Sequence, residues 1–303
     1  MRLTGLHHIT MITGDAQRNV DFYADTLGLR FVKKTVNFDA PEAYHLYFGD
    51  EKGTPGTILT WFEFPGAAAG RPGIGQIHTL QLAVPSEAAL DFWAARLGVE
   101  RHGDHIHFQD PDGLQLELVV ESLGNAPLTA QHPEIPAEHA LQGFEGVRAY
   151  SSNPDASRSL LEETMGFEPR GELFWESRGD IRGSTYAYDE PPEKVGVQGA
   201  GTVHHVAWAS PAEEHEAWRD RVLAAGMHAT PVIDRFYFRS VYYREPSGVL
   251  FEIATLGGPG FAIDEPVEHL GEKLSLPPFI EHLRPEIEPR LRPITNPRQV
   301  AAG

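Results

Sequence analysis

The pattern of apolar and polar residues repeats four times along the chain. Each repeat begins with a short apolar strand, continues through a helix of about three turns and ends in further strands, a periodicity typical of one supersecondary unit used several times. We therefore predict four units with the order β-α-β-β-β. Their first strands are GLHHITMIT from Gly5, QIHTLQLAV from Gln76, GFEGVRAYS from Gly143 and TVHHVAWAS from Thr202.

The first unit shows how the elements are predicted. Residues 6–13 are rich in β-branched and apolar side chains, which favours a strand. Asp15 can cap the helix that follows, and Gly28 is suited to end it. Three further strands are expected at about residues 29–37, 43–49 and 56–63, and the helices of the other units at about 86–97, 155–165 and 211–225.

Positions that are apolar in all units are expected to serve folding, whereas polar residues found in only some units are candidates for chemistry. Units one and three align without a gap at a shift of 138 residues, from Gly5 to Gly143, and apolar positions then coincide. The alignment sets His8 against Gly146, and matching IHTL with VHHV sets Thr79 against His205. Because this opening position is histidine in only two units, the fold does not require histidine there.

The last strand of each unit holds a second variable position, the closing position. Matching DPDGLQLEL with EPSGVLFEI sets Glu117 against Glu252, and Thr60 holds this place in unit one, whereas unit three gives no clear match. Glu252 lies within the apolar strand VLFEIA, where an unpaired buried carboxylate would be strongly destabilising. We therefore expect a cation beside Glu252.

Pairing of units brings these positions together. A unit with one apolar sheet face cannot bury that face alone, so pairs of units should form sheets that curve into cups. If units one and four share a cup, it holds His8, His205 and Glu252, with Thr60 as the fourth residue. A lone histidine is usually a surface or core residue, but two histidines and one carboxylate form the facial triad of non-haem Fe(II) sites.

The second cup, from units two and three, lacks these donors. It would hold Thr79, Glu117, Gly146 and at most one further ligand, and we expect it to contain no metal, with Glu117 as a relic or a hydrogen-bonded structural group. His7 and His204 alternate away from the first cup in an ideal strand, although a β-bulge would bring either one beside the metal ligands.

Composition narrows the function class. The 303 residues carry a formal charge of −18 without a run of lysine or arginine, so no nucleic-acid partner is expected. The chain has no cysteine, which leaves nitrogen and oxygen donors and favours Fe(II), Mn(II) or Zn(II). No stretch approaches the roughly 20 apolar residues of a membrane span, and no secretory signal begins the chain, so we expect a cytoplasmic protein without a membrane partner.

The order of the units suggests an α+β fold with three parts. Residues 1–130 are predicted to form an N-terminal domain from units one and two, and residues 131–257 a C-terminal domain from units three and four. Residues 258–303 are rich in proline and should form a tail with one short helix, packed over the body.

With these residues in view, the chain resembles the vicinal oxygen chelate superfamily. The motifs GLHHIT, VHHVAWA and REPSGVLFEIAT carry the resemblance, which extends over nearly the whole chain. Within the superfamily, the chain is most similar to ring-cleaving dioxygenases that include the hydroquinone 1,2-dioxygenases of chlorophenol degradation and the quinone-responsive bacillary proteins. The resemblance implies the vicinal oxygen chelate fold, with four βαβββ modules paired into two cup-shaped mixed sheets.

The resemblance also implies an activity and roles for residues. It implies an Fe(II)-dependent oxidoreductase that cleaves the ring of a hydroquinone or catechol with O2, and it allows a homo-oligomer. A purified sample could carry Mn(II) or Zn(II) instead of iron. The family's metal ligands correspond to His8, His205 and Glu252. Its acid-base and substrate-orienting residues correspond to Tyr242, His204, Arg235 and Thr10.

Two other functions use the same fold. A metal-dependent isomerase or lyase of the glyoxalase kind needs a fourth protein ligand or a catalytic carboxylate, and Thr60 in that position counts against it. A non-catalytic small-molecule binder of the bleomycin-resistance type uses the fold without metal, but a cup that serves folding alone gains nothing from three polar ligands.

Overall fold

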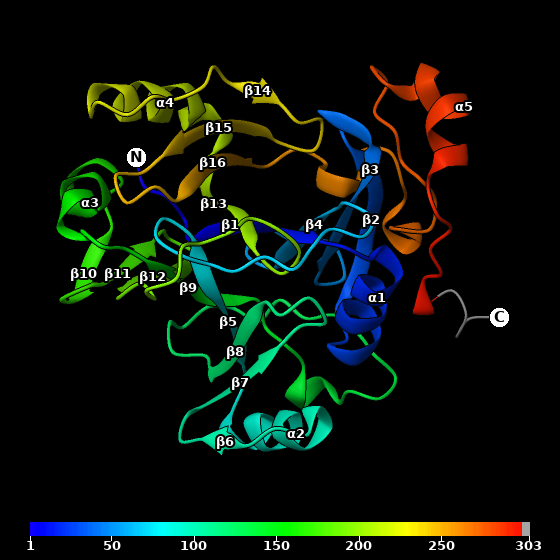
Figure 1. Ribbon diagram of the computed structural model, residues 1–303, viewed down its shortest axis with the longest axis horizontal. Helices are drawn as coiled ribbons and strands as arrows, with labels where there is room; N and C mark the ends of the chain where they lie inside the picture. Colours follow the sequence, from blue (N-terminus) through cyan, green and yellow to red (C-terminus); the bar gives the residue numbers. More distant parts are fainter. Residues whose placement is uncertain (299–303) are drawn as a thin grey trace.

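Two eight-stranded mixed sheets form the body of the protein in a computed structural model, which describes residues 1–298 (Figure 1). The first sheet has the order β14 (Ile233–Asp234), β15 (Arg239–Arg244), β16 (Leu250–Leu256), β13 (Val203–Pro211), β1 (Leu6–Thr13), β4 (Ile58–Glu63), β3 (Ala40–Gly49) and β2 (Arg30–Asn37). The second has the order β10 (Glu168–Gly171), β11 (Phe174–Arg178), β12 (Gly183–Asp189), β9 (Phe144–Tyr150), β5 (Ile77–Val84), β8 (Gln115–Val120), β7 (His105–Gln109) and β6 (Arg101–His102).

Each sheet combines two units that are not consecutive in the sequence. Units one and four form the first sheet, joined by antiparallel pairing of β1 with β13, and units two and three form the second, joined by β5 with β9. In every unit the first strand pairs in parallel with the last. The predicted α+β fold of four βαβββ units in two mixed sheets is confirmed.

The helices begin and end close to the predicted residues. The Asp15 side chain accepts a hydrogen bond from the backbone N–H of Arg18, as expected of a helix cap. In units one and three the helix continues into a π-helical turn, which the sequence pattern did not indicate. The helical segments of the four units are α1 (Ala16–Val20) with η1 (Asp21–Thr26), α2 (Glu87–Leu97), α3 (Asp155–Ser159) with η3 (Leu160–Thr164), and η4 (Ala212–Glu214) with α4 (His215–Ala224).

Alternation along the strands separates the hydrophobic core from the cups. Trp61 on β4 is fully buried, and its ring centroid lies 4.0 Å from that of Tyr23 on the helix of unit one. Because successive side chains of a strand point to opposite faces, the neighbouring Thr60 points to the other face of the sheet. All five tryptophans are fully buried. The core therefore fixes the orientation of the polar residues on the opposite face.

Hydrogen bonds also connect consecutive units. The Tyr23 hydroxyl of unit one donates to Asp110 in the last turn of unit two, at 2.9 Å. The Tyr188 hydroxyl of unit three donates to Glu245 in the corresponding turn of unit four, at 2.8 Å. Consecutive units are thus tied through turns, while non-consecutive units share sheets. The predicted division into an N-terminal domain, residues 1–130, and a C-terminal domain, residues 131–257, stays a prediction.

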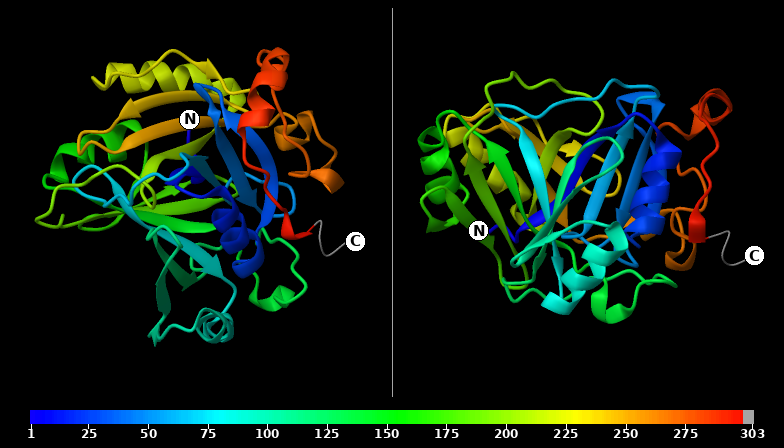
Figure 2. Two further views of the ribbon diagram at one scale, coloured as in Figure 1. Left: turned by 45° about the vertical axis from the view of Figure 1, so that its right-hand side comes forward. Right: turned by 60° about the horizontal axis from the view of Figure 1, so that its bottom comes forward.

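The C-terminal segment packs alongside the first sheet, next to β2 and β3 (Figures 1 and 2). The fully buried ammonium of Lys33 on β2 forms ion pairs with Asp264, at 2.7 Å, and with Glu265. These ion pairs join the C-terminal segment to β2, while residues 299–303 of the predicted tail lie outside the described part of the chain. Its short helices are η5 (Gly260–Ile263), η6 (Val267–His269), η7 (Glu281–Leu283), α5 (Arg284–Ile287) and η8 (Glu288–Arg290), and η2 (Ala137–His139) lies between the halves.

Within residues 1–298, none of the helices has the length and apolar character needed to cross a membrane.

Candidate metal centre

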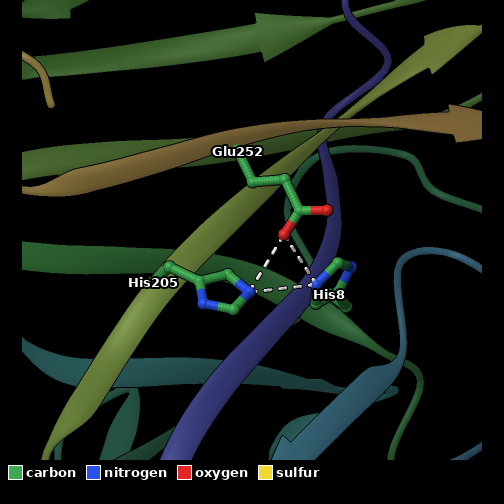
Figure 3. A group of neighbouring side chains, drawn as sticks. All are labelled: His8, His205 and Glu252. Carbon is green, nitrogen blue, oxygen red and sulfur yellow. Dashed lines mark hydrogen bonds and ion pairs between the residues drawn. The ribbon is translucent and has the colours of Figure 1, made fainter. Parts of the chain in front are cut away.

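Three side chains predicted as metal ligands converge in the first sheet (Figure 3). His8 comes from β1, His205 from β13 and Glu252 from β16, which are neighbouring central strands. The Glu252 Oε2 atom lies 3.1 Å from His8 Nε2 and 2.9 Å from His205 Nε2, and the two Nε2 atoms are 3.3 Å apart. The structure therefore brings the three residues together from positions 8 and 252 at opposite ends of the sequence.

Strand register explains this convergence. Glu252 pairs with Ala207 on β13, two residues beyond His205, so both side chains point to one face of the sheet. Ala207 pairs in turn with His8 across the β1–β13 junction. The register shifts between Leu6 and His8, which marks an irregularity in β1 directly before the histidine.

The carboxylate of Glu252 is buried, and within the described residues only one of its two oxygen atoms accepts a hydrogen bond. Glu252 is 0% exposed, and its Oε1 atom accepts a hydrogen bond of 2.5 Å from the Ser240 hydroxyl. Oε2 lies close to both imidazoles, but neither contact has hydrogen-bond geometry. Three donors bound at about 2.1 Å and roughly 90° to one another would be about 3 Å apart, so the triangle fits a metal ion.

The protonation states suit metal binding. Burial raises the pKa of Glu252, but the His8 and His205 imidazoles outweigh that effect and hold the pKa well below its usual range. Burial lowers the pKa of His205 more strongly than the neighbouring Glu252 raises it. An ionised carboxylate and a neutral imidazole are the forms that coordinate a metal.

The histidine before each candidate ligand also contacts it. His7 Nδ1 lies 2.9 Å from His8 Nδ1, and His204 Nδ1 lies 2.8 Å from His205 Nδ1. These contacts occupy the Nδ1 atoms of His8 and His205 and leave their Nε2 atoms facing Glu252, an arrangement common for metal-ligating histidines. His204, a predicted site residue, is exposed, whereas His7 is buried.

A cavity of about 410 Å³ opens beside the three residues, and His8 and His205 line it. The predicted residues Thr10, His204, Arg235 and Tyr242 all line it. Further aromatic lining comes from Phe38, Phe62, Phe64 and Phe238. A second cavity of about 560 Å³ adjoins at His204 and His205 and is lined by the loops at residues 74–77 and 192–198. The cavity of about 410 Å³ is large enough for a small aromatic molecule and is lined by both aromatic rings and polar groups.

Arg235 and Tyr242 form a polar pair in this cavity. The Arg235 Nε donates to the Tyr242 hydroxyl at 3.2 Å, and its Nη1 donates to Asp39 Oδ2 at 3.0 Å. Burial and the Glu252 carboxylate raise the pKa of Tyr242, against the opposing effect of Arg235, so the phenol keeps its proton. The next residue, Phe236, has a φ of 70°, an uncommon conformation for a non-glycine residue.

The sequence did not reveal a hydrogen-bonded chain beside the candidate ligands. Tyr47 hydroxyl and His45 Nδ1 are 2.8 Å apart, and His45 Nε2 lies 2.7 Å from the Thr60 hydroxyl. Thr60 in turn donates to the Thr10 hydroxyl at 3.1 Å. The alternation in AYHLYF puts His45 and Tyr47 on one strand face, which was the available signal. No sequence pattern indicated Asp39, because its hydrogen bond with Arg235 joins two units that are far apart in the sequence.

Known proteins resemble this chain in sequence. The family model of the Glyoxalase/Bleomycin resistance protein/Dioxygenase superfamily matches residues 5–118. A Bacillus subtilis protein named "Putative ring-cleaving dioxygenase MhqO" is 45% identical, over 95% of this chain and 96% of the relative. The chlorohydroquinone/hydroquinone 1,2-dioxygenase of Sphingobium indicum is 33% identical, over 98% of this chain and 97% of the relative.

Solved structures give the same picture. A crystal structure described as a "putative dioxygenase" from Bacillus subtilis has a TM-score of 0.89 and 43% identity, with 97% of this chain and 98% of that chain covered. Glyoxalase I from Zea mays has a TM-score of 0.55 and 14% identity, with 83% and 92% covered. The second likeness concerns the fold alone.

Proposed function

The chain belongs to the glyoxalase/bleomycin resistance protein/dioxygenase superfamily as a ring-cleaving dioxygenase, and from this premise we propose its substrate class and metal. The protein opens the ring of a hydroquinone or catechol with O2, at an Fe(II) ion held by His8, His205 and Glu252. The observation that carries the proposal is the Glu252 Oε2 atom, which has no hydrogen bond within the described residues and is buried next to two imidazole Nε2 atoms. A buried carboxylate with one oxygen atom free of hydrogen bonds favours a cation beside that atom.

The donor set suits this ion. Two imidazoles and one carboxylate leave open positions, and the facial triad is the usual arrangement for non-haem Fe(II) that binds oxygen. Bound Fe(II) would hold a substrate oxygen and O2 next to each other and pass electrons from the ring to oxygen. Both atoms of O2 enter the product as a ring carbon–carbon bond breaks, so the substrate supplies the electrons and no external reductant is needed.

The protein residues around the cavity bind and orient the substrate. The apolar rings of Phe38, Phe62 and Phe238 border the space for an aromatic ring and exclude water. Arg235 can hold a substrate oxygen, and Tyr242 can donate a hydrogen bond or a proton from its hydroxyl. His204 lies at the exposed edge of the cavity, where it can accept the proton of an incoming hydroxyl.

The two competing functions receive less support from the geometry. The Thr60 hydroxyl is engaged with Thr10 and His45, so the fourth position offers neither a carboxylate nor a free ligand for isomerase chemistry. A binder without metal would leave the Glu252 Oε2 atom buried without a hydrogen bond, at a cost of about 1–3 kcal/mol.

The test combines metal loading with oxygen consumption. Protein purified without oxygen and loaded with Fe(II) should consume about one O2 per substrate on at least one member of a panel of hydroquinones and catechols, with loss of the aromatic absorbance. Mn(II)-loaded and Zn(II)-loaded samples serve as controls for the metal. Stoichiometric iron binding without oxygen consumption on any member would overturn the dioxygenase assignment, and failure to bind iron would overturn the ligand assignment.

A further inference from the structure

Three further metal-binding side chains meet in the second sheet. His105 and His107 lie on β7 and Glu117 lies on the neighbouring β8, with one donor atom of each within 4.8 Å of the others. His107 pairs directly with Glu117 across the two strands, and His107 Nε2 lies 3.6 Å from Glu117 Oε1. His105 is two residues away, so its side chain points to the same face of the sheet.

These residues occupy the same places in the second cup that site residues occupy in the first. His107 pairs with Glu117 as Tyr242 pairs with Glu252. His105 then corresponds to Ser240, the residue whose hydroxyl bonds Glu252. The second cup therefore also has a closing carboxylate, but its two imidazoles come from the adjacent strand instead of the opening strands.

Neighbouring side chains orient the donors. The Asp104 Oδ1 atom lies 3.0 Å from His105 Nδ1, which leaves Nε2 of that ring free. The Gln81 amide donates to Glu117 Oε2 at 2.7 Å and leaves Oε1 on the side of His107. A carboxylate that holds the second ring nitrogen is a common partner of a metal-ligating histidine.

Burial and exposure also fit a cation that enters from solvent. Glu117 is buried, at 7% exposure, while the His107 side chain is 48% exposed. The carboxylate is therefore fixed, and the imidazole can rotate towards it without a large rearrangement. The His107 side chain is far more exposed than those of His8 and His205, so the second site should bind metal more weakly.

We propose that His105, His107 and Glu117 form a second metal site, which binds a divalent transition-metal ion of the Zn²⁺ class with water in the remaining positions. Two imidazole nitrogens favour Zn²⁺, Ni²⁺ or Cu²⁺ over Mg²⁺ and Ca²⁺, which prefer oxygen donors. The bound ion links β7 to β8 near the sheet edge, and it stabilises the folded chain because it does not bind the unfolded chain equally well. This proposal replaces our expectation that the second cup contains no metal.

The test measures Zn²⁺ binding in the full chain after the first site has been disabled. The double variant His8→Ala/His205→Ala should still bind about one Zn²⁺ per chain in equilibrium dialysis with elemental analysis. Addition of His107→Ala should abolish this binding, and addition of Glu117→Gln should weaken it by at least about tenfold. Zn²⁺ should also raise the melting temperature of the double variant, by less when Glu117→Gln is added and not at all when His107→Ala is added.

The matched control is His102→Ala, since His102 is an exposed histidine on β6 of the same hairpin but lies outside the cluster. This change should leave Zn²⁺ binding at the level of the double variant. If the double variant bound no Zn²⁺, or if His107→Ala and Glu117→Gln both left binding unchanged, the second site would not exist. Displacement of Zn²⁺ by millimolar Mg²⁺ would contradict the assigned imidazole donors. Glu117→Gln, which nearly preserves side-chain shape, decides the case if His107→Ala fails to fold.

Discussion

The two sheets have the same architecture and register, yet their cups carry different chemistry. In the first cup the opening positions are His8 and His205, whose rings reach the buried Glu252. In the second cup the corresponding residues are Gly146 and Thr79. A Cβ at Gly146 would overlap the Thr185 hydroxyl, so that position has no room for any side chain, let alone an imidazole. The same backbone therefore folds with or without ligands at the opening positions.

Two buried carboxylates, Glu252 in the first sheet and Glu145 in the second, also differ in their surroundings. Two imidazoles hold Glu252 in the ionised form in the first sheet. In the second sheet, burial raises the pKa of Glu145 to about 6, because only Ser122 donates to Oε1 and Oε2 has no hydrogen bond within the described residues. A carboxylate beside nitrogen donors is suited to hold a cation, whereas an isolated buried carboxylate is suited to hold a proton.

The largest expected effect tests whether the opening histidines of the first cup bind the iron. His8→Ala, His205→Ala and Glu252→Gln should each abolish Fe(II) binding at this site and reduce turnover to background, because each removes one of three donors. Anaerobic iron titration and oxygen consumption measure the two effects. Stoichiometric iron in any one of these variants would remove that residue from the ligand set.

His78→Ala is the matched change in the second sheet. His78 precedes the opening residue Thr79, and its Nε2 atom lies within hydrogen-bond distance of Asp189 Oδ2, at 2.9 Å, in the second sheet. Iron binding and turnover should stay at parental values in this variant. If His78→Ala abolished iron binding as well, the two cups would not be independent and the comparison between them would fail.

A second prediction compares equivalent tyrosines within the first cup. Tyr242 pairs with the closing residue Glu252 and Tyr47 pairs with the closing residue Thr60. Tyr242→Phe should keep the metal and lower turnover by about 10²–10⁴-fold, the range for loss of a general acid or base. Tyr47→Phe should change turnover little and destabilise the fold by about 1 kcal/mol, through loss of its hydrogen bond with His45.

Steady-state kinetics with metal analysis distinguish the two tyrosines. Parental turnover in Tyr242→Phe combined with slow turnover in Tyr47→Phe would transfer the proton-donating role to unit one and to the chain of Tyr47, His45 and Thr60.

A third, smaller effect concerns the ion pair that joins units one and four at the cavity. Asp39→Asn removes the carboxylate from Arg235, but the Asp39 side chain is 74% exposed and such pairs contribute little. We expect KM to rise less than about tenfold with kcat nearly unchanged. Arg235→Lys should have a larger effect, because a lysine cannot reproduce the separate contacts with Asp39 and Tyr242. A larger effect from Asp39→Asn than from Arg235→Lys would contradict the proposed substrate role of Arg235.

Comparison of repeats explains what the sequence could predict. The units, their pairing and the residues His8, His205 and Glu252 follow from apolar positions that all units share and polar positions that they do not. The residue at the closing position of unit three could not be identified from the sequence, because the last strand of that unit lacks a Pro-Gly or Pro-Ser-Gly turn before it. The structure identifies it as Ala187, which pairs with Arg148 as Thr60 pairs with Thr10.

Features that depend on contacts between elements could not be predicted in this way. The hydrogen bond between Asp39 and Arg235 joins the turn between β2 and β3 to the residue after β14, although β2 and β14 form opposite edges of one sheet. The cluster of His105, His107 and Glu117 was missed because the unit comparison followed opening and closing positions, and the two histidines lie on the strand between them.

The smallest effect tests the buried proton of the second sheet. The pKa of Glu145 is about 6 in the folded chain and ordinarily about 4.5, so folding retains a proton at pH 5 that the unfolded chain has largely released. Glu145 therefore makes the folded chain more stable at pH 5 than at pH 8, and this contribution is lost as the pH rises through about 6. Glu145→Gln cannot titrate and should reduce the difference in unfolding free energy between pH 5 and pH 8 by about 1–2 kcal/mol. Urea unfolding of both chains at the two pH values measures this difference, and Glu121→Gln, at a half-buried neighbour, is the control that should leave most of it in place. An unchanged difference in Glu145→Gln would mean that Glu145 is ionised in the folded chain at both pH values. Glu145 and Glu252 would then carry the same charge and differ only in the side chains around them.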